Sequence, residues 1–253
     1  MAEKEGLLKE GSKIVEATSG NTGIGLAAIG VSKGYEVIIV MPDTMSLERR
    51  KFVIGYGAKL VLTDGTLGMK GAIAKALEMQ AEDPSIFIPS QFENKANVYA
   101  HYTTTGPEID RDLDSKVDVF VAGVGTGGTV TGVGTYLKER NPGVRIVAVE
   151  PTASPVLSGG APGKHVIQGI GAGFIPAILD TSIYDEIIQV SNSDAVRTAQ
   201  LLSKTEGLFV GISSGAALHA ALTLAKQEEY KGKNIVVLLP DNGDRYLSTV
   251  LFD

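Results

Sequence analysis

The 253-residue chain carries 23 basic and 29 acidic side chains, for a formal net charge of −6, and contains no cysteine. This acidic balance argues against nucleic-acid or anionic-membrane partners, because no basic run is present to neutralise their phosphates. Disulfides, thiolate catalysis and cysteine-based metal sites are excluded within these residues. The longest apolar runs are too short to span a bilayer, and 43% hydrophobic content suffices for a large core. We therefore expect a cytoplasmic globular protein.

Short segments rich in Val and Ile alternate with segments of helical periodicity along nearly the whole sequence. Strands are expected at 13–17, 37–41, 58–63, 86–88, 117–122, 144–150, 186–191 and 234–240. Helices are expected at 24–29, 46–56, 69–82, 131–140, 193–206 and 214–229. Ser46 is a candidate cap of its helix, and residues 192–195 open another in the same way. Several strands are apolar throughout, which is typical of parallel strands buried on both faces. The sequence thus predicts an α/β fold with two lobes and doubly wound, mostly parallel sheets.

One stretch interrupts this rhythm. Residues 151–181 are rich in Gly and Pro and have little periodicity. A loop this long inside a compact domain is usually functional or disordered. We place the boundary between the two lobes near 92–107, which gives a lobe at 1–92 and another at 93–253.

Two glycine-rich turns lie between an expected strand and an expected helix. The first is Thr-Ser-Gly-Asn-Thr-Gly at 18–23, and the second is Gly-Val-Gly-Thr-Gly-Gly-Thr at 123–129. A strand that turns into a helix through glycines directs backbone N–H groups at one point, where the helix dipole also favours negative charge. Two such turns suggest a ligand with two anionic ends, such as a phosphorylated cofactor that holds a small carboxylic acid.

The second turn permits three interpretations. Its Gly123-x-Gly125-x-x-Gly128 pattern matches the dinucleotide fingerprint, and Glu150 follows at a distance suited to a ribose contact. An NAD site and another phosphate cradle are equally supported by this segment alone, and a purely structural turn is the third interpretation. The hydroxyls of Thr126 and Thr129 favour a compact phosphate dianion.

A series of motifs resembles the fold-type II enzymes that use pyridoxal phosphate, and within them the cysteine synthases, or O-acetylserine sulfhydrylases. The resemblance covers the whole chain. The motifs occur in the family's order: Glu-Ala-Thr-Ser-Gly-Asn-Thr-Gly-Ile-Gly-Leu-Ala at 16–27, Met-Pro-Asp-Thr-Met-Ser-Leu-Glu-Arg-Arg at 41–50, Gly-Met-Lys-Gly-Ala-Ile at 68–73, Thr-Thr-Gly-Pro-Glu-Ile at 104–109, Gly-Thr-Gly-Gly-Thr at 125–129, Ile-Gln-Gly-Ile-Gly-Ala-Gly-Phe-Ile-Pro at 167–176, Gly-Ile-Ser-Ser-Gly-Ala at 211–216 and Pro-Asp-Asn-Gly-Asp-Arg-Tyr-Leu-Ser-Thr at 240–249.

The resemblance implies a role for each turn. Asn21 would bind the phenolic oxygen of the pyridoxal ring, and Ser213 would face the pyridine nitrogen. The phosphate would be held by Gly125, Thr126, Gly127, Gly128 and Thr129. The substrate carboxylate would be bound by Thr18, Ser19, Gly20, Thr22 and Gln91. Helix capping is the plain alternative for Ser19 or Thr22 and for Ser213 or Ser214.

The resemblance also implies how the lobes are used. Residues 1–92 would form the smaller lobe with the carboxylate loop, of which 35–82 would be mobile, and 93–253 the larger cofactor lobe. Residues 168–174 would line the same cleft as Asn21 and Ser213. The histidines at 101, 165 and 219 have no ligand spacing, so no metal site is expected. Lys70 is interpreted as a solvated lysine at a helix start.

The printed sequence departs from the family in one respect. Family members carry a lysine, in a motif of the type Gly-Ser-Val-Lys-Asp-Arg, which holds the cofactor covalently and moves the substrate's α-proton. That motif does not occur in these 253 residues. We therefore assign no catalytic residue, and we expect a chain truncated at its N-terminus relative to the family, with impaired or no activity by itself.

The function implied is that of the cysteine synthases, the replacement of the acetate of O-acetylserine by sulfide with pyridoxal phosphate. The partners would be a small amino acid and either a second copy of the chain or a complementing N-terminal segment. Two alternatives stay open. One is a non-catalytic remnant that binds pyridoxal phosphate, an amino acid or a peptide, and the other is an NAD-binding protein.

Overall fold

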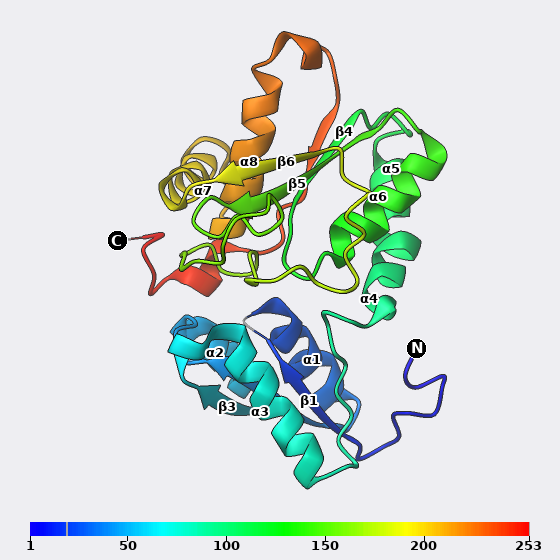
Figure 1. Ribbon diagram of the computed structural model, residues 1–253, viewed down its shortest axis with the longest axis vertical. Coiled ribbons are helices and arrows are strands. Elements are labelled where there is room, and N and C mark those ends of the chain that lie inside the picture. Colours follow the sequence, from blue (N-terminus) through cyan, green and yellow to red (C-terminus); the bar gives the residue numbers. More distant parts are fainter. Residues whose placement is uncertain (19, 253) are drawn as a thin grey trace. The chain divides into compact units, whose positions relative to one another are not determined.

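The computed structural model describes residues 1–18 and 20–252, and the chain divides into two compact units, Met1–Gln91 and Phe92–Asp253 (Figure 1). Each unit has a parallel sheet with helices packed on both faces, which confirms the predicted α/β class. The roles predicted for the two lobes, and the mobility of residues 35–82, stay predictions.

The first unit contains a three-stranded parallel sheet in the order β1-β2-β3. Its elements are β1 (Lys13–Ala17), α1 (Asn21–Ser32), β2 (Glu36–Pro42), α2 (Leu47–Gly55), β3 (Lys59–Thr63), the 3-10 turn η1 (Gly65–Leu67) and α3 (Gly68–Glu82). The strand predicted at 86–88 is reduced to a single parallel bridge between Phe87 and Ile14. Pro89 follows directly and has no N–H to donate to a ladder, which limits the pairing.

Alternate residues of β2 explain why helices cover both faces of this sheet. Val37 and Ile39 pack in one cluster with buried residues of α1 and α2. Ile38 and Val40 point the other way and pack with Ala72 and Ala76 of α3. A strand whose side chains are apolar on both faces is buried on both faces, as the unbroken Val-Ile-Ile-Val sequence predicts.

The second unit contains a four-stranded sheet in the order β6-β5-β4-β7, with every neighbouring pair parallel. Its elements are α4 (Lys95–Ala100), the π-helical turn η2 (His101–Thr105), α5 (Gly106–Asp112), β4 (Val119–Gly123), α6 (Gly128–Arg140), β5 (Arg145–Pro151), β6 (Glu186–Val190), α7 (Asn192–Glu206), α8 (Ile212–Ala225), η3 (Glu228–Tyr230), β7 (Ile235–Val237) and η4 (Gly243–Tyr246).

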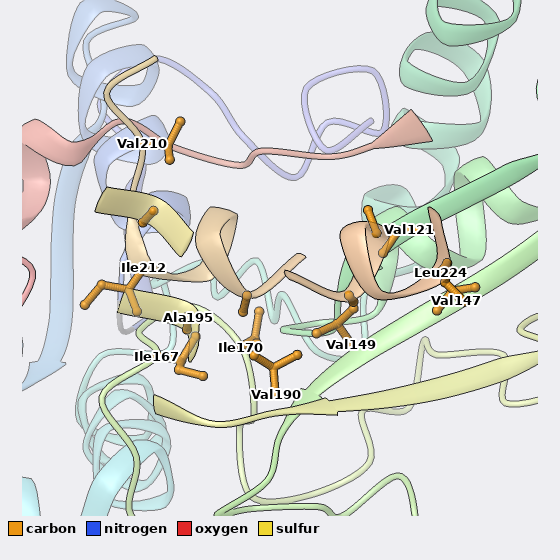
Figure 2. Packing of buried hydrophobic residues seen from close by; sticks show 14 of the residues in the cluster. Val121, Val147, Val149, Ile167, Ile170, Val190, Ala195, Val210, Ile212 and Leu224 are labelled. Carbon is orange, nitrogen blue, oxygen red and sulfur yellow. The ribbon is translucent and has the colours of Figure 1, made fainter. Parts of the chain in front are cut away.

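The central strands of this unit divide its core into two layers. Val121 and Val149 join a cluster with residues of α7 and α8, including Ala195 and Leu224 (Figure 2). Their neighbours Phe120 and Ala148 face the opposite layer, with Val130, Val133 and Leu137 of α6. The two layers are therefore built from alternate residues of the same strands, which is the doubly wound arrangement expected from the sequence.

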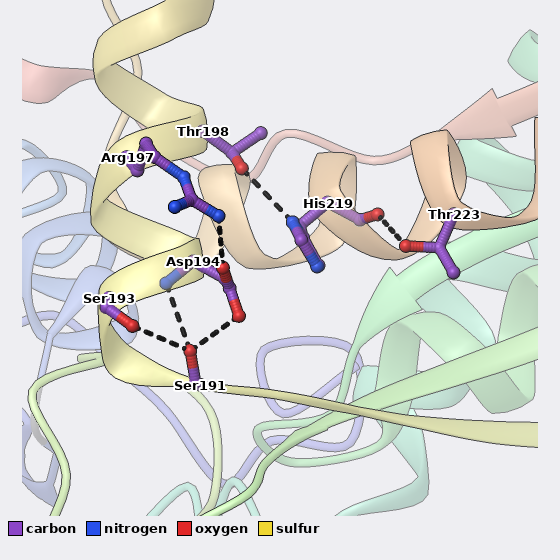
Figure 3. Close-up of polar contacts among 7 residues, drawn as sticks. All are labelled: Ser191, Ser193, Asp194, Arg197, Thr198, His219 and Thr223. Atoms are coloured by element: carbon purple, nitrogen blue, oxygen red, sulfur yellow. Dashed lines mark hydrogen bonds and ion pairs between the residues drawn. The ribbon is translucent and has the colours of Figure 1, made fainter.

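Helix α7 begins with a side-chain cap. Ser191 Oγ accepts a hydrogen bond from the backbone N–H of Asp194 over 3.1 Å, and Arg197 pairs with the Asp194 carboxylate (Figure 3). The hydroxyl of Ser191 also holds the pKa of Asp194 below its usual range. At Gly215 of α8 a side chain would overlap the backbone of Ala195, so this glycine allows α7 and α8 to approach closely.

Several element ends differ from the sequence prediction. Helix α8 ends at Ala225 rather than 229, and an acidic 3-10 turn, η3, follows it. Helix α6 starts at Gly128, three residues early, because Gly127 takes a left-handed conformation that turns the chain directly into the helix. Strand β7 keeps only Ile235–Val237 of the predicted 234–240. The structure describes every residue of 152–185, the segment between β5 and β6, and this segment contains no helix or strand.

Among residues 1–18 and 20–252, no helix combines the length and apolar character needed to cross a membrane.

Candidate cofactor site

The turn after β4 has the geometry of an anion site. Strand β4 ends at Gly123, Gly127 has φ of 84°, and α6 begins at Gly128. The first N–H groups of a helix have no intrahelical acceptor, so those at the start of α6 are available to a ligand. The positive end of the helix dipole lies at the same point, and it favours a phosphate or carboxylate there.

Steric crowding explains why this turn consists of glycines. A Cβ atom at Gly125 would overlap the backbone oxygen of Gly169, and one at Gly128 would overlap the side-chain amide of Asn97. A Cβ at Gly127 would lie 2.7 Å from Cβ of Leu179. Each of these close approaches needs a residue without a side chain, so neighbouring protein atoms pack tightly against the turn.

Both threonine hydroxyls of the turn are positioned by neighbouring side chains. Thr126 Oγ1 accepts hydrogen bonds from Asn97 Nδ2 over 2.9 Å and from the N–H of Gly128 over 3.3 Å. Thr129 Oγ1 lies 3.2 Å from His101 Nε2, within hydrogen-bonding distance. Burial lowers the pKa of His101, so its ring is neutral at pH 7 and can orient the Thr129 hydroxyl without adding charge.

Ser213 lies close to the same turn. It is 3% exposed in the first turn of α8, and a Cβ at Gly169 would lie 3.9 Å from its Oγ. Since Gly169 O also lies against Gly125, the structure brings Gly125, Gly169 and Ser213 together in one place. The hydroxyl of Ser213 makes no hydrogen bond within the described part of the chain, whereas Ser214 Oγ donates to Asp241 O over 3.3 Å.

The capping alternative for these serines is wrong. The N-cap residue of α8 is Gly211, and no side chain caps this helix. Ser213 and Ser214 are therefore inside the first turn rather than at the cap position. A buried, unused hydroxyl beside an anion site is instead suited to a ligand atom.

The structure also argues against the dinucleotide alternative. Glu150, which would bind a ribose, is 2% exposed and accepts hydrogen bonds from the backbone N–H groups of Leu157 and Ser158 with its two carboxylate oxygens. A carboxylate that is buried and satisfied by the protein cannot serve a ribose without losing these bonds. Glu150 fixes the start of the following loop.

In the first unit, the predicted carboxylate loop joins β1 to α1. Thr18 is buried, and its Oγ1 accepts a hydrogen bond from the N–H of Gly20 over 3.1 Å. Gly20 is the N-cap residue of α1, so Asn21 and Thr22 occupy the first helical positions and the capping alternative for Thr22 does not hold. Ser19, a further predicted carboxylate ligand, lies outside the described residues.

Gln91 lies beside this loop, because its Nε2 donates to the backbone oxygen of Ala17 over 2.6 Å. Its N–H contacts Glu16 Oε1 over 3.4 Å. The Glu16 carboxyl is 2% exposed, and burial raises its pKa to about 7. Glu16 could not be selected from the sequence, since a single acidic residue within a strand is not distinctive.

Arg49 of α2 is a second residue that sequence reasoning missed. Its side chain has no solvent exposure, and its Nη1 donates to Asn21 Oδ1 over 2.9 Å. A Cβ atom at Gly20 would overlap the same guanidinium. Two adjacent arginines on a helix ordinarily form a solvated face, and nothing in their spacing distinguishes Arg49 from Arg50.

The predicted residues therefore gather within each unit: Thr18, Gly20, Asn21, Thr22 and Gln91 in the first, and Gly125, Thr126, Gly127, Gly128, Thr129 and Ser213 in the second. Their assignment to cofactor and substrate, and the cleft predicted to join Asn21 with Ser213, stay predictions. No group of three or more His, Asp or Glu side chains suited to a metal ion occurs in the described residues. Lys70 is exposed near the start of α3.

The second unit fits pyridoxal phosphate. The turn leads into α6, whose first amides have no intrahelical acceptor and can donate to a phosphate. A buried neutral hydroxyl, that of Ser213, lies near the turn and could meet a ring nitrogen. Fold and site together define an α/β protein that binds a phosphorylated cofactor.

Comparison with known proteins makes this class specific. Residues 1–241 match the family described as pyridoxal-phosphate dependent enzyme, and the chain belongs to this family. It is 56% identical over 252 residues to a cysteine synthase of Staphylococcus aureus (strain N315), which covers 99% of this chain and 81% of the relative.

Solved structures agree with the family. A cysteine synthase from Entamoeba histolytica is 49% identical, with a TM-score of 0.94 over 99% of this chain and 74% of that one. O-ureido-L-serine synthase is 45% identical, with a TM-score of 0.95 over 100% of this chain and 79% of that one. The predicted fold-type II architecture and the predicted cofactor are thus confirmed at the level of the family.

Proposed function

We propose that this chain belongs to a cysteine synthase, which replaces the acetate of O-acetylserine with sulfide. The observation that carries the proposal is the Gly125–Thr129 turn, with Gly169 and Ser213 beside it. Support for the substrate class comes from similarity to cysteine synthases over 99% of the chain. The similarity to O-ureido-L-serine synthase makes other β-substituted serines the natural comparison substrates.

In this proposal the second unit holds the cofactor. Pyridoxal phosphate supplies an electron sink for bonds at the substrate's α-carbon. Gly125, Thr126, Gly127, Gly128 and Thr129 bind its phosphate. Ser213 faces the pyridine nitrogen, and a hydroxyl there does not keep that nitrogen protonated as a carboxylate would. The sink is therefore moderate, which suits loss of a β-substituent.

The first unit binds the amino-acid substrate. The loop of Thr18, Ser19, Gly20 and Thr22 receives its carboxylate at the start of α1, together with Gln91, and Asn21 binds the phenolic oxygen of the ring. Residues 35–82 close over the substrate when the carboxylate is bound. The proposal includes a cytoplasmic location and a homodimer or a complementing segment as partner.

Residues 1–253 contain no lysine in the motif that the family uses to hold the cofactor covalently. We therefore propose that these residues alone bind pyridoxal phosphate weakly, without turnover, and that turnover needs a lysine from outside them. Loss of a general base costs about 10²–10⁴-fold in rate.

The test is an assay of residues 1–253 for cysteine formed from O-acetylserine and sulfide, with pyridoxal phosphate present. Borohydride reduction and peptide mapping of the same sample would report any covalent attachment. We expect reversible cofactor binding and no cysteine. A stoichiometric adduct on one lysine, such as Lys70, together with sulfide-dependent cysteine formation, would show that the chain has its own catalytic lysine.

A second candidate function is a non-catalytic module that binds pyridoxal phosphate, an amino acid or a peptide. The observation that favours it is the same lack of the lysine motif in the sequence. Adding the family's lysine-bearing segment, as a fusion or a second chain, separates the two candidates. Restored cysteine formation supports the enzyme, and cofactor binding that never leads to cysteine supports the module.

A further inference from the structure

Thr126 has an unusual set of hydrogen-bond partners. A threonine hydroxyl has one proton to donate and two lone pairs to accept with. Both acceptor positions on Thr126 Oγ1 are filled, one by Asn97 Nδ2 at 2.9 Å and the other by the N–H of Gly128 at 3.3 Å. The proton of this hydroxyl must therefore point away from both donors.

No acceptor for that proton occurs among the residues that the structure describes. Thr126 is half-buried, so the free O–H has access to a ligand beside the turn. It stands in the same turn as the N–H groups of Thr129 and Val130, which have no intrahelical acceptor in the first turn of α6. An anion bound there would accept from the hydroxyl and from these amides at once.

We propose that Asn97 is a positioning residue that makes Thr126 a donor to the phosphate group of the ligand. Without Asn97, the hydroxyl could rotate and donate elsewhere. With Asn97 donating to Oγ1, the proton is directed to the ligand before binding. This inference rests on the proposed cofactor site and adds a residue outside the glycine turn to it.

A second contact of Asn97 supports this role. Its side-chain amide lies against Gly128, where a Cβ atom would overlap Oδ1. Asn97 therefore contacts both the hydroxyl and the first residue of α6, so it fixes the turn from the side of α4. The helix that carries it is held by a separate cap, since Asn94 Oδ1 accepts from the N–H of Ala96 over 2.9 Å.

The experiment compares pyridoxal phosphate with pyridoxal, which lacks the phosphate, by equilibrium dialysis or fluorescence titration of the purified chain. In Asn97→Ala we expect affinity for pyridoxal phosphate to fall by about tenfold or more, the usual effect of a lost hydrogen bond to a charged group, with no change for pyridoxal. Asn97→Asp keeps the size of the side chain but replaces the donor by an acceptor. Its carboxylate would accept the hydrogen bond of the Thr126 hydroxyl and repel the phosphate. The loss of affinity for pyridoxal phosphate should therefore be larger than in Asn97→Ala.

Asn94→Ala is the matched control, because it removes the cap of the same helix without touching Thr126. It should lower the melting temperature and leave the preference for the phosphate-bearing ligand unchanged. In a Thr126→Val background the effect of Asn97→Ala should vanish, because the hydroxyl that Asn97 positions is gone. If Asn97→Ala does not fold, Asn97→Asp keeps the test decisive, because it preserves the size of the side chain and removes only the donor.

Three results would decide against the proposal. Equal losses for pyridoxal phosphate and pyridoxal would show that Asn97 only supports the fold. An effect of Asn97→Ala that is fully retained in Thr126→Val would exclude action through Thr126. Finally, a wild-type chain that binds both ligands equally would overturn the phosphate role of the turn, and the proposed cofactor site would fall with it.

Discussion

Arg49 Nη1 donates a hydrogen bond to Asn21 Oδ1 over 2.9 Å, which ties α2 to the first residue of α1. The guanidinium also fills the space that a side chain at Gly20 would need. A fully buried cation therefore fixes the loop that is proposed to bind the substrate carboxylate.

Replacement of Arg49 by Met should weaken the fold and the loop together. Loss of one partner of a buried, hydrogen-bonded charge typically costs about 3 kcal/mol of unfolding free energy. Urea denaturation would measure this loss. Titration with O-acetylserine or an unreactive amino-acid analogue would measure the affinity of the loop for a substrate carboxylate, which should fall. Lys51→Met is the matched control, since Lys51 is an exposed cation on the same helix. Equal results for both variants would contradict the role given to Arg49.

The buried carboxyl of Glu16 should make stability depend on pH. Its pKa is about 7 in the folded chain, against an ordinary value of 4.5. Between these values the unfolded chain releases the proton while the folded chain keeps it, so the free energy of unfolding falls as pH rises from about 4.5 to 7. The total loss is roughly 3 kcal/mol, and the effect is constant above pH 7.

Glu16→Gln mimics the protonated carboxyl and should remove this dependence. Denaturation at several pH values should show the variant more stable than the wild type at pH 8 and equal to it near pH 4. Glu36→Gln is a control of opposite sign, because a hydrogen bond from Lys59 lowers the pKa of Glu36. If the difference in unfolding free energy between Glu16→Gln and the wild type does not change with pH, Glu16 is ionised in the folded chain.

Gly125→Ala should disrupt the cofactor turn. The added methyl group would overlap Gly169 O, and relief of such overpacking costs about 1–3 kcal/mol and moves the backbone. We expect a lower melting temperature and a loss of pyridoxal phosphate binding. Gly25→Ala, in the exposed part of α1 with nothing within 4 Å, should instead stabilise by about 0.5–1 kcal/mol. Binding that survives Gly125→Ala would place the phosphate elsewhere.

Ser213 and Ser214 should respond differently to substitution by Ala. Ser214→Ala removes the hydrogen bond to Asp241 O and should cost about 1 kcal/mol, with cofactor binding unchanged. Ser213→Ala should change stability by less than about 0.5 kcal/mol, because its hydroxyl has no bond to break within the described chain. It should nevertheless alter the absorbance spectrum of bound pyridoxal phosphate. The reverse pattern would exchange the roles of the two serines.

The main features of the fold could be predicted because strands such as β2 are apolar throughout and the turns carry glycine. The hydrophobic pattern predicts where helices and strands lie, but not the residues at which they begin and end. Gly127 moved the start of α6 by three residues, through a left-handed conformation that composition does not reveal. The glycine turns of the site could also be predicted, because their geometry, like that of the strands, depends on local sequence.

The supporting residues of the site were not predictable. Arg49, Asn97 and Glu16 act through contacts with residues 28, 29 and 75 positions away in the sequence. Each is of a type that is common on protein surfaces, so its burial follows only from the three-dimensional packing. The capping role of Ser213 or Ser214 was rejected for a similar reason, since α8 begins at Ile212 with Gly211 as its N-cap residue.

The long connection between β5 and β6 is fastened at several places along its length. Glu150 holds the N–H groups of Leu157 and Ser158, and Gly171 N–H donates to Val124 O over 3.0 Å. These hydrogen bonds divide the segment into closed rings of different length rather than one free loop. Because the entropy of closing a ring grows only slowly with its length, one ring can gain residues at little cost. Insertions near the exposed residues 158–164 would then be tolerated in evolution without displacing Gly169 from the turn.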